Sequence, residues 1–118
     1  MDDMEIMQYL NTKSALERIR GNVKLFKMVL ASFLDTRTQF EQLQKEIEAN
    51  DREAASKSVH ALKGVAANLS MMALYDICPP FEALLKTDAD TSESMVSFGA
   101  AYEKTVECVN AILPTLPV

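Results

Sequence analysis

Apolar residues recur every three or four positions along most of the chain, which is the pattern of amphipathic helices that share a core. The longest such stretch covers residues 23–48 and contains neither glycine nor proline. A helix of this length extends about 39 Å, so the pattern predicts one full-length pillar of a helical bundle. Its apolar stripe consists of Val29, Phe33, Phe40, Leu43 and Ile47, with Thr36 in the slot that lacks an apolar side chain.

A short turn at residues 49–51 follows, and it forces the next helix to run antiparallel to the first. We expect Asn50 to cap this second helix, with Glu53 completing a capping box. The second helix ends near Leu69 or Ser70. Ser70 is then expected to cap the third helix of the bundle.

The pair Pro79-Pro80 falls inside the third helix. An interior proline removes a backbone hydrogen bond and clashes with the preceding turn. The third helix therefore either kinks at this pair, or breaks and restarts with proline in its first turn. A loop at residues 87–91 leads to the last helix, which begins near Asp90 and Glu93 and ends at Pro114.

One or two short helices are expected before the bundle, over residues 13–20 and, as a second candidate, residues 4–10. Asn11 or Thr12 caps the helix at residues 13–20, Gly21 ends it, and Asn22 caps the long helix that follows. The fold class is therefore all-α: an antiparallel up-down four-helix bundle over residues 22–113. One or two short N-terminal helices form a helical lid over residues 1–21.

Composition narrows the class of protein. The chain has 118 residues, 48% hydrophobic and 25% charged, which suits one globular domain. No apolar run approaches the ~20 residues that span a bilayer, and the acidic start lacks the basic segment of a secretory signal. Cys78 and Cys108 form no metal or redox motif, which favours reduced thiols in a cytoplasmic protein. A net charge of −5 without a lysine or arginine block argues against nucleic-acid binding.

The only histidine, His60, lies in the second bundle helix. At roughly 100° per residue it points roughly 120° away from the centre of the apolar stripe, toward the flank or the solvent. Lys63 and Gly64 follow one turn later, and glycine costs a helix about 1 kcal/mol relative to alanine. On spacing alone two interpretations stay open: a functional imidazole in a small clearing, or an ordinary surface histidine beside a glycine needed for close packing.

Few chemistries are available to this histidine. One histidine excludes most metal sites, and no phosphate-cradling GxxxxGK[ST] motif is present, so neither ATP binding nor self-phosphorylation is expected. No serine or cysteine nucleophile can be paired with His60 from the sequence. A neutral imidazole can itself accept a phosphoryl group near neutral pH. Lys63 would then offset the added negative charge.

These residues carry a resemblance to a known family. The run His60-Ala61-Leu62-Lys63-Gly64-Val65-Ala66-Ala67-Asn68-Leu69 resembles the signature of the histidine-containing phosphotransfer (HPt) domains of bacterial multistep phosphorelays. Residues 15–22 and 25–34 are similar to the family's entry into its first long helix, and residues 50–53 to its inter-helix turn. Leu74, Cys78 and Phe81-Glu82 fall where the family has its third bundle helix. The likeness covers about residues 10 to 86; at Ser70 the family usually has glycine.

The resemblance implies a single HPt domain over residues 1–118 and a mechanism. His60 would accept a phosphoryl group from a receiver-domain phospho-aspartate and pass it to the aspartate of another receiver. Lys63 would be the phosphate charge partner, Gly64 would provide steric clearance, and Glu82 would orient the imidazole if Pro79-Pro80 leaves it within reach. The domain would have no cofactor of its own, with Mg²⁺ in the partner receiver, and no autokinase activity. Partners would be response-regulator receiver domains and a hybrid sensor histidine kinase, and the domain would be a cytoplasmic monomer.

An apolar docking patch for receivers is also expected around the histidine. Its candidates are Ile6, Met7, Leu10, Met71 and Met72. Two other functions remain as alternatives: an HPt-like helical module that docks a partner without phosphotransfer, and an enzyme with His60 as general base. The early Met1 and the proline-containing end favour a free-standing protein over an excised domain.

Overall fold

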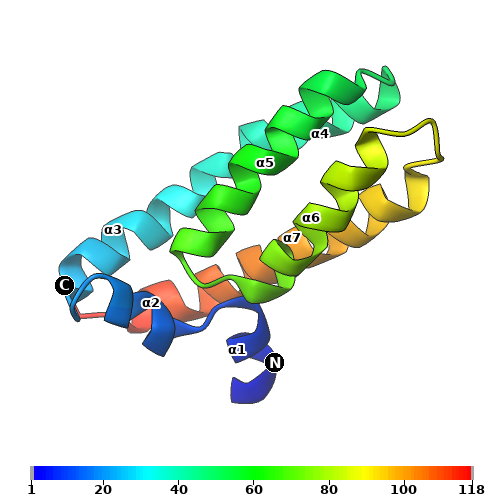
Figure 1. Cartoon of the computed structure of the whole chain (residues 1–118). Helices are drawn as coiled ribbons and strands as arrows, with labels where there is room; N and C mark the ends of the chain where they lie inside the picture. Colours follow the sequence, from blue (N-terminus) through cyan, green and yellow to red (C-terminus); the bar gives the residue numbers. More distant parts are fainter. Residues whose placement is uncertain (1, 118) are drawn as a thin grey trace.

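The computed structural model describes residues 2–117, and all its regular secondary structure is helical. The fold is the expected antiparallel four-helix bundle, with short helices at one end (Figure 1). The molecule is elongated, with extents of 46 × 24 × 20 Å. The elements are α1 (Asp3–Tyr9), α2 (Thr12–Arg18), α3 (Val23–Phe33), η1 (Leu34–Thr36), α4 (Arg37–Glu48), α5 (Arg52–Asn68), α6 (Met72–Leu85), α7 (Ser92–Ile112) and η2 (Leu113–Thr115).

The long first pillar is formed as predicted, except that one 3₁₀ turn divides it into α3 and α4. That turn contains Thr36, the polar residue in the apolar stripe. Its hydroxyl donates to the carbonyl of Phe33 and lies 2.8 Å from the hydroxyl of Tyr102 on α7. The stripe is therefore interrupted by a polar group because a polar partner from α7 meets it there.

The core is a single cluster that all four pillars share. Aromatic rings fill its middle: Phe40 stacks on Tyr102 with ring centroids 4.3 Å apart, and Phe81 meets Phe98 edge-on at 5.8 Å. Arg37 covers this cluster from outside, with its guanidinium 4.9 Å from the Tyr102 centroid and paired with Glu103. That hydrogen-bonded pair holds the pKa of the Glu103 carboxyl below its usual range.

Two predicted helix caps are wrong. Asn50 does not cap α5; it takes a left-handed conformation, with φ of 53°, and ends the turn of α4. The carboxylate of Asp51 caps α5 instead, accepting from the amide of Ala54 at 3.2 Å. Ser70 likewise has φ of 54° and does not cap α6, whose N-cap residue is Met71. Glycine adopts the left-handed backbone conformation most easily. This explains why the family that the sequence resembles usually has glycine where this chain has Ser70.

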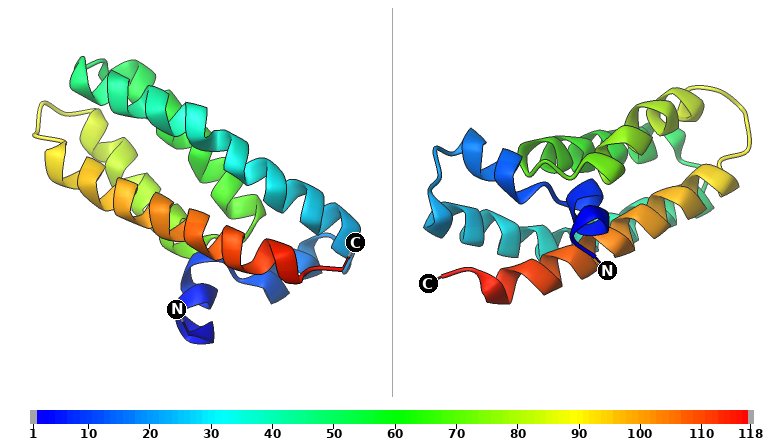
Figure 2. Two further views of the ribbon diagram at one scale, coloured as in Figure 1. Left: turned by 180° about the vertical axis from the view of Figure 1, so that it is seen from behind. Right: turned by 90° about the horizontal axis from the view of Figure 1, so that it is seen from below.

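The short helices at the N-terminal end follow the predicted caps. Asn11, rather than Thr12, caps α2 by accepting from the amide of Ser14, and Asn22 caps α3. Gly21, with φ of 73°, ends the α2 turn. Helix α1 packs beside α6 and α7, and α2 packs beside α3 (Figure 2).

Helix α6 continues without a break through Pro79 and Pro80, so the predicted alternative of a broken helix is wrong. Both prolines are exposed. The carbonyls of Tyr75 and Asp76, which would normally accept from these two positions, therefore lack their helical amide donors. Because the prolines lie on the outer side, the helix keeps its buried face against the core. No helix within residues 2–117 is long and apolar enough to cross a membrane.

Candidate functional site

The candidate site lies on α5 and α6, which run side by side along one face of the bundle (Figure 1). The buried side of α5 consists of Ala55, Val59, Leu62 and Ala66. This apolar side fixes the rotation of the helix and turns His60 outward, as its angle from the apolar stripe predicts. The His60 side chain is 72% exposed. The imidazole is therefore accessible to a partner while the backbone beneath it is packed into the core.

Glu82 reaches this imidazole from α6. Nδ1 of His60 lies 3.3 Å from Oε1 of Glu82. An ionised carboxylate only accepts hydrogen bonds, so this contact favours the form of the ring that donates from Nδ1. The other ring nitrogen, Nε2, is then left with its lone pair. The unbroken course of α6 through Pro79 and Pro80 is what keeps Glu82 opposite His60.

The same carboxylate also holds Lys63. Nζ of Lys63 donates to Oε2 of Glu82 at 3.2 Å, and these side chains are only 21% and 17% exposed. Each oxygen of Glu82 thus has its own partner, and both partners lie on α5, one turn apart. The lysine neutralises the carboxylate in a partly buried position, where an unpaired charge would be costly. Without an incoming anion, the ammonium of Lys63 is therefore committed to Glu82.

Gly64 lies one turn beyond His60, and the space beside it is open. A Cβ atom built on Gly64 would meet no heavy atom within 4 Å. Close packing therefore does not require glycine here, so the close-packing explanation of Gly64 is wrong. Because glycine has no side chain, nothing at this position projects from the surface beside the imidazole.

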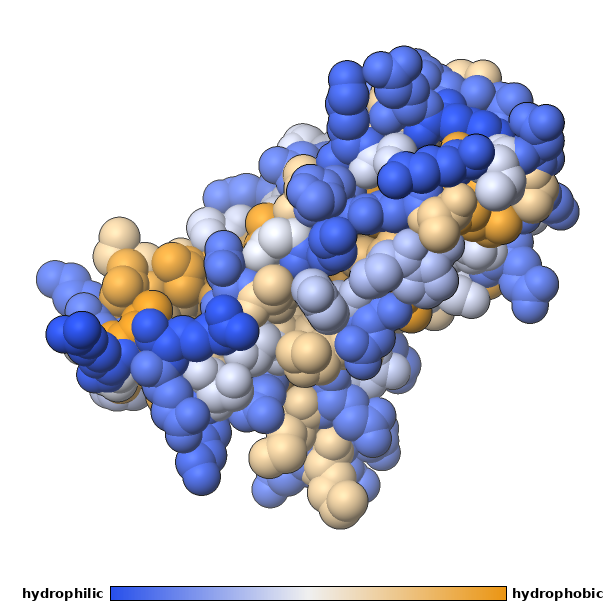
Figure 3. Space-filling model, in the orientation of Figure 1, coloured by the Kyte–Doolittle hydropathy of each residue, from blue (hydrophilic) through white to orange (hydrophobic). Residues whose placement is uncertain are grey.

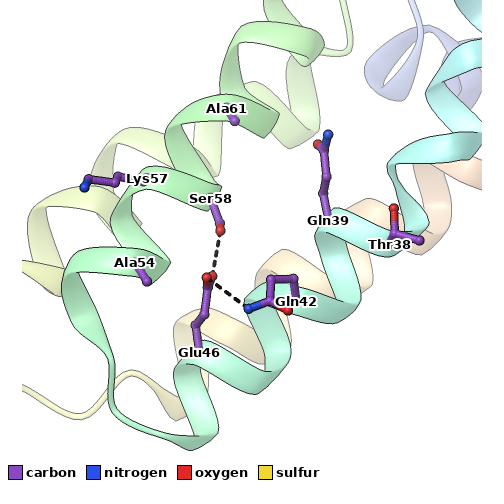
Figure 4. A pocket seen from close by; sticks show the side chains of 8 residues that line it. All are labelled: Thr38, Gln39, Gln42, Glu46, Ala54, Lys57, Ser58 and Ala61. Atoms are coloured by element: carbon purple, nitrogen blue, oxygen red, sulfur yellow. Dashed lines mark hydrogen bonds between the residues drawn. The ribbon is translucent and has the colours of Figure 1, made fainter.

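Surface hollows flank α5 on both sides of His60. Between α5 and α6 a hollow of about 330 Å³ is lined by Ser56, Lys57, His60, Ala61, Glu82 and Lys86. On the other flank a groove of about 490 Å³ lies between α4 and α5 and shares Lys57 and Ala61 with it. In that groove Glu46 accepts hydrogen bonds from Ser58 and Gln42, and Lys57 extends away from them (Figure 4). The larger groove does not include His60.

The Hpt domain family model matches residues 27–112 of the chain. The chain belongs to the Hpt domain family. Its matched region begins inside α3 and contains the whole α5–α6 site. As an Hpt domain it is a phosphotransfer module of phosphorelays, in a family whose members are phosphocarriers and not kinases.

A solved structure supports the same fold. The Hpt domain is similar to "the HPT domain from the Hpt Sensor Hybrid Histidine Kinase from Shewanella", with a TM-score of 0.77 and 19% sequence identity. The alignment covers 95% of this chain and 99% of the other. At this level of identity the likeness shows the four-helix fold. A search of curated proteins found no significant match.

The apolar docking patch predicted for this Hpt domain is wrong for two of its residues. Leu10 and Met71 are only 1% and 0% exposed and belong to the core. Met7 and Met72 are exposed, at 56% and 41%, and Ile6 is half-buried against the core. Leu10 lies at the end of α1, where that helix packs on α6. Its apolar character therefore reflects burial in the core and not a docking surface.

The structure adds two residues that the sequence analysis missed. Lys57 and Lys86 line the hollow beside His60. Helical spacing could have identified both lysines. Lys57 precedes His60 by three residues and Lys86 follows Glu82 by four, so each lysine shares a helix face with a site residue. Within residues 2–117 no three histidine, cysteine or acidic side chains gather in a possible metal site.

Proposed function

We propose that this Hpt domain carries a phosphoryl group on Nε2 of His60, taking it from the phospho-aspartate of one receiver domain and giving it to the aspartate of another. The observation that supports this most directly is the hydrogen bond from Nδ1 of His60 to Glu82. With Nδ1 as the donor, the neutral ring keeps a lone pair on Nε2, as a phosphoryl acceptor requires, and the His60 side chain is 72% exposed. His60 is also the only histidine of the chain.

The transfer can be written atom by atom. The Nε2 lone pair attacks phosphorus, the N–P bond forms, and the P–O bond to the aspartate breaks, so that the aspartate leaves as a carboxylate. The phosphorylated ring keeps its Nδ1 proton and becomes cationic, facing the carboxylate of Glu82. Passing the group to a second receiver reverses these steps, with neutral imidazole as the leaving group.

The neighbouring residues support this chemistry in separate ways. Glu82 orients the ring and selects the tautomer. Lys63 is one turn from His60 and becomes the charge partner of the phosphoryl group. Gly64 gives the receiver clearance to approach the ring. The domain supplies no cofactor; Mg²⁺ belongs to the receiver.

We expect response-regulator receiver domains as partners, with a hybrid sensor histidine kinase upstream. A hybrid histidine kinase contains the domain to which this fold is similar. In this proposal the domain acts in the cytoplasm as a monomer, without autokinase activity. Residues 1–118 would form one unit, with α1 and α2 as the helical lid on the bundle.

The test is transfer of ³²P from phosphorylated receivers. A panel of receivers encoded by the same genome would be phosphorylated with acetyl phosphate and mixed with the full chain. The expected result is label on the wild-type chain that is lost in acid and stable in alkali, and no label on His60→Gln. Label that persists on His60→Gln would refute the proposal. Binding of receivers without transfer from any of them would favour the docking-only alternative.

A further inference from the structure

The cations that remain available beside His60 are not those of the sequence signature. Lys63 is paired with Glu82 and is 21% exposed. Lys57 is 79% exposed and has only a weak partner, Glu53, one turn away at 3.6 Å. The side chain of Lys86 has no ion-pair partner among residues 2–117. Both Lys57 and Lys86 line the hollow that His60 borders.

The positive character extends along the α5–α6 groove. A second hollow, of about 450 Å³, adjoins the first and shares Ser56, Lys57 and Lys86 with it. Together the two hollows are lined by three cationic side chains, those of Arg52, Lys57 and Lys86, against two carboxylates, those of Glu53 and Glu82. The whole chain has a net charge of −5. The groove beside His60 therefore has the opposite sign to the rest of the molecule.

Because the surface around the groove is polar, electrostatic attraction is the main interaction that it offers to a partner. The upper part of α5 is largely hydrophilic, whereas apolar side chains gather toward α1 and α3, with a smaller apolar group near the end of α6 (Figure 3). An acidic chain repels an anionic partner at a distance, and local cations in a hollow lower that barrier. Charges of this kind act mainly on the rate of encounter and on partner choice.

We infer that Lys57 and Lys86 form a docking rim that recognises the acidic mouth of a phosphorylated receiver and steers it onto His60. The inference rests on the function proposed above and adds the residues that determine its specificity. The occupant is a receiver whose phospho-aspartate and neighbouring carboxylates present negative charge. Lys57 approaches from the α5 side of the hollow and Lys86 from the α6 side. Both lysines lie one helical turn from the His60–Glu82 pair, on the side toward Arg52, so a partner held between them lies against one edge of the imidazole.

The experiment compares charge reversals in the full chain. Lys57→Glu, Lys86→Glu and the double variant would be measured against Lys104→Glu, an exposed lysine on α7 with the same change of charge. The rate of transfer from the labelled receivers would be followed at low and high salt. We expect the double variant to lower kcat/KM about tenfold or more at low salt, with kcat unchanged. The loss shrinks at high salt because the ions screen the rim.

Each outcome bears on one of the two proposals. Rates of Lys57→Glu and Lys86→Glu equal to that of Lys104→Glu would overturn the rim, while wild-type transfer would leave the proposed function intact. Receiver affinity would also be measured by calorimetry in the His60→Gln background, where no transfer occurs. Weaker binding of the lysine variants there supports the rim even if wild-type transfer fails. If the panel neither labels nor binds the chain, both proposals are wrong.

Discussion

The carboxylate of Glu82 faces Nδ1 of His60 across the α5–α6 contact, with 3.3 Å between Nδ1 and Oε1. Free imidazole in water does not have this carboxylate to favour the Nδ1–H form, so we expect the contact to select the tautomer. We predict that ¹⁵N NMR of the neutral ring finds the proton on Nδ1 in the wild type and on Nε2 in Glu82→Ala.

The same substitution should slow phosphoryl transfer roughly tenfold, the lower end of the effect of losing a group that orients a functional histidine. Glu82→Gln keeps an acceptor oxygen and is the matched control; its ring should retain the Nδ1 proton. An unchanged tautomer in Glu82→Ala would show that the hydrogen bond does not govern the ring.

Gly64→Ala separates the needs of the fold from the needs of the partner. Because a Cβ at Gly64 meets no heavy atom within 4 Å, alanine should raise the free energy of unfolding by about 1 kcal/mol. Transfer from a receiver should nevertheless fall about tenfold or more, because the methyl group displaces the partner from the reacting geometry. Urea denaturation and the ³²P assay measure the two effects.

Gly99→Ala is the matched control for that change. Gly99 lies on α7, where its Cβ would be 3.6 Å from Cζ of Phe40, an ordinary contact. This variant should leave transfer at the wild-type rate. Equal transfer by Gly64→Ala and Gly99→Ala would remove the clearance role from Gly64.

Arg52 braces the end of the bundle farthest from α1. Its guanidinium donates to the carbonyl of Leu84 at 3.3 Å, to the carbonyl of Ala89 at 2.5 Å and to the side chain of Asn50 at 3.1 Å. Arg52→Ala should lower the free energy of unfolding by about 2 kcal/mol. The substitution removes the charged donor from backbone carbonyls at the end of a helix, which then lose their hydrogen bonds. Arg52→Lys should recover only part of this, because one ammonium cannot span the three acceptors. Urea denaturation distinguishes the variants, and an unchanged midpoint for Arg52→Ala would contradict the brace.

Cys78 makes the bundle sensitive to alkali. Burial, followed by the nearby charge of Glu82, raises the pKa of its thiol from 9.0 to about 12. The folded chain therefore keeps a proton that the unfolded chain loses above pH 9, and stability falls from there toward pH 12 by up to ~1.4 kcal/mol per pH unit. Cys78→Ala should flatten that part of the profile of unfolding free energy against pH. The same slope in both proteins would show that another group is responsible.

Helix identity and the exposure of His60 followed from apolar spacing, because both depend only on which residues share a helix face. The positions of Asn50 and Ser70 did not. Asparagine and serine are good caps, but they also tolerate the left-handed backbone, and tertiary context decides between these roles. Ser70 is held by Ser14, 56 positions away, which spacing cannot show.

Other features required the packed structure. The prolines of α6 are tolerated because they face outward, and a propensity scale records only their cost. The pairing of Lys63 with Glu82, 19 positions apart, depends on the register of α5 against α6. Lys57 and Lys86 carry no signature of their own and become recognisable only when they line the same hollow as His60.

The unbroken course of α6 through its two prolines has a consequence for the order of folding. His60 and Glu82 are 22 positions apart and belong to one helical hairpin. Closing a segment of this size costs little more entropy than closing a shorter one, and such local contacts form early. The imidazole and its carboxylate can meet as soon as α6 has been synthesised, before α7 arrives to complete the bundle. We therefore expect the histidine site to be among the first tertiary features that the nascent chain acquires.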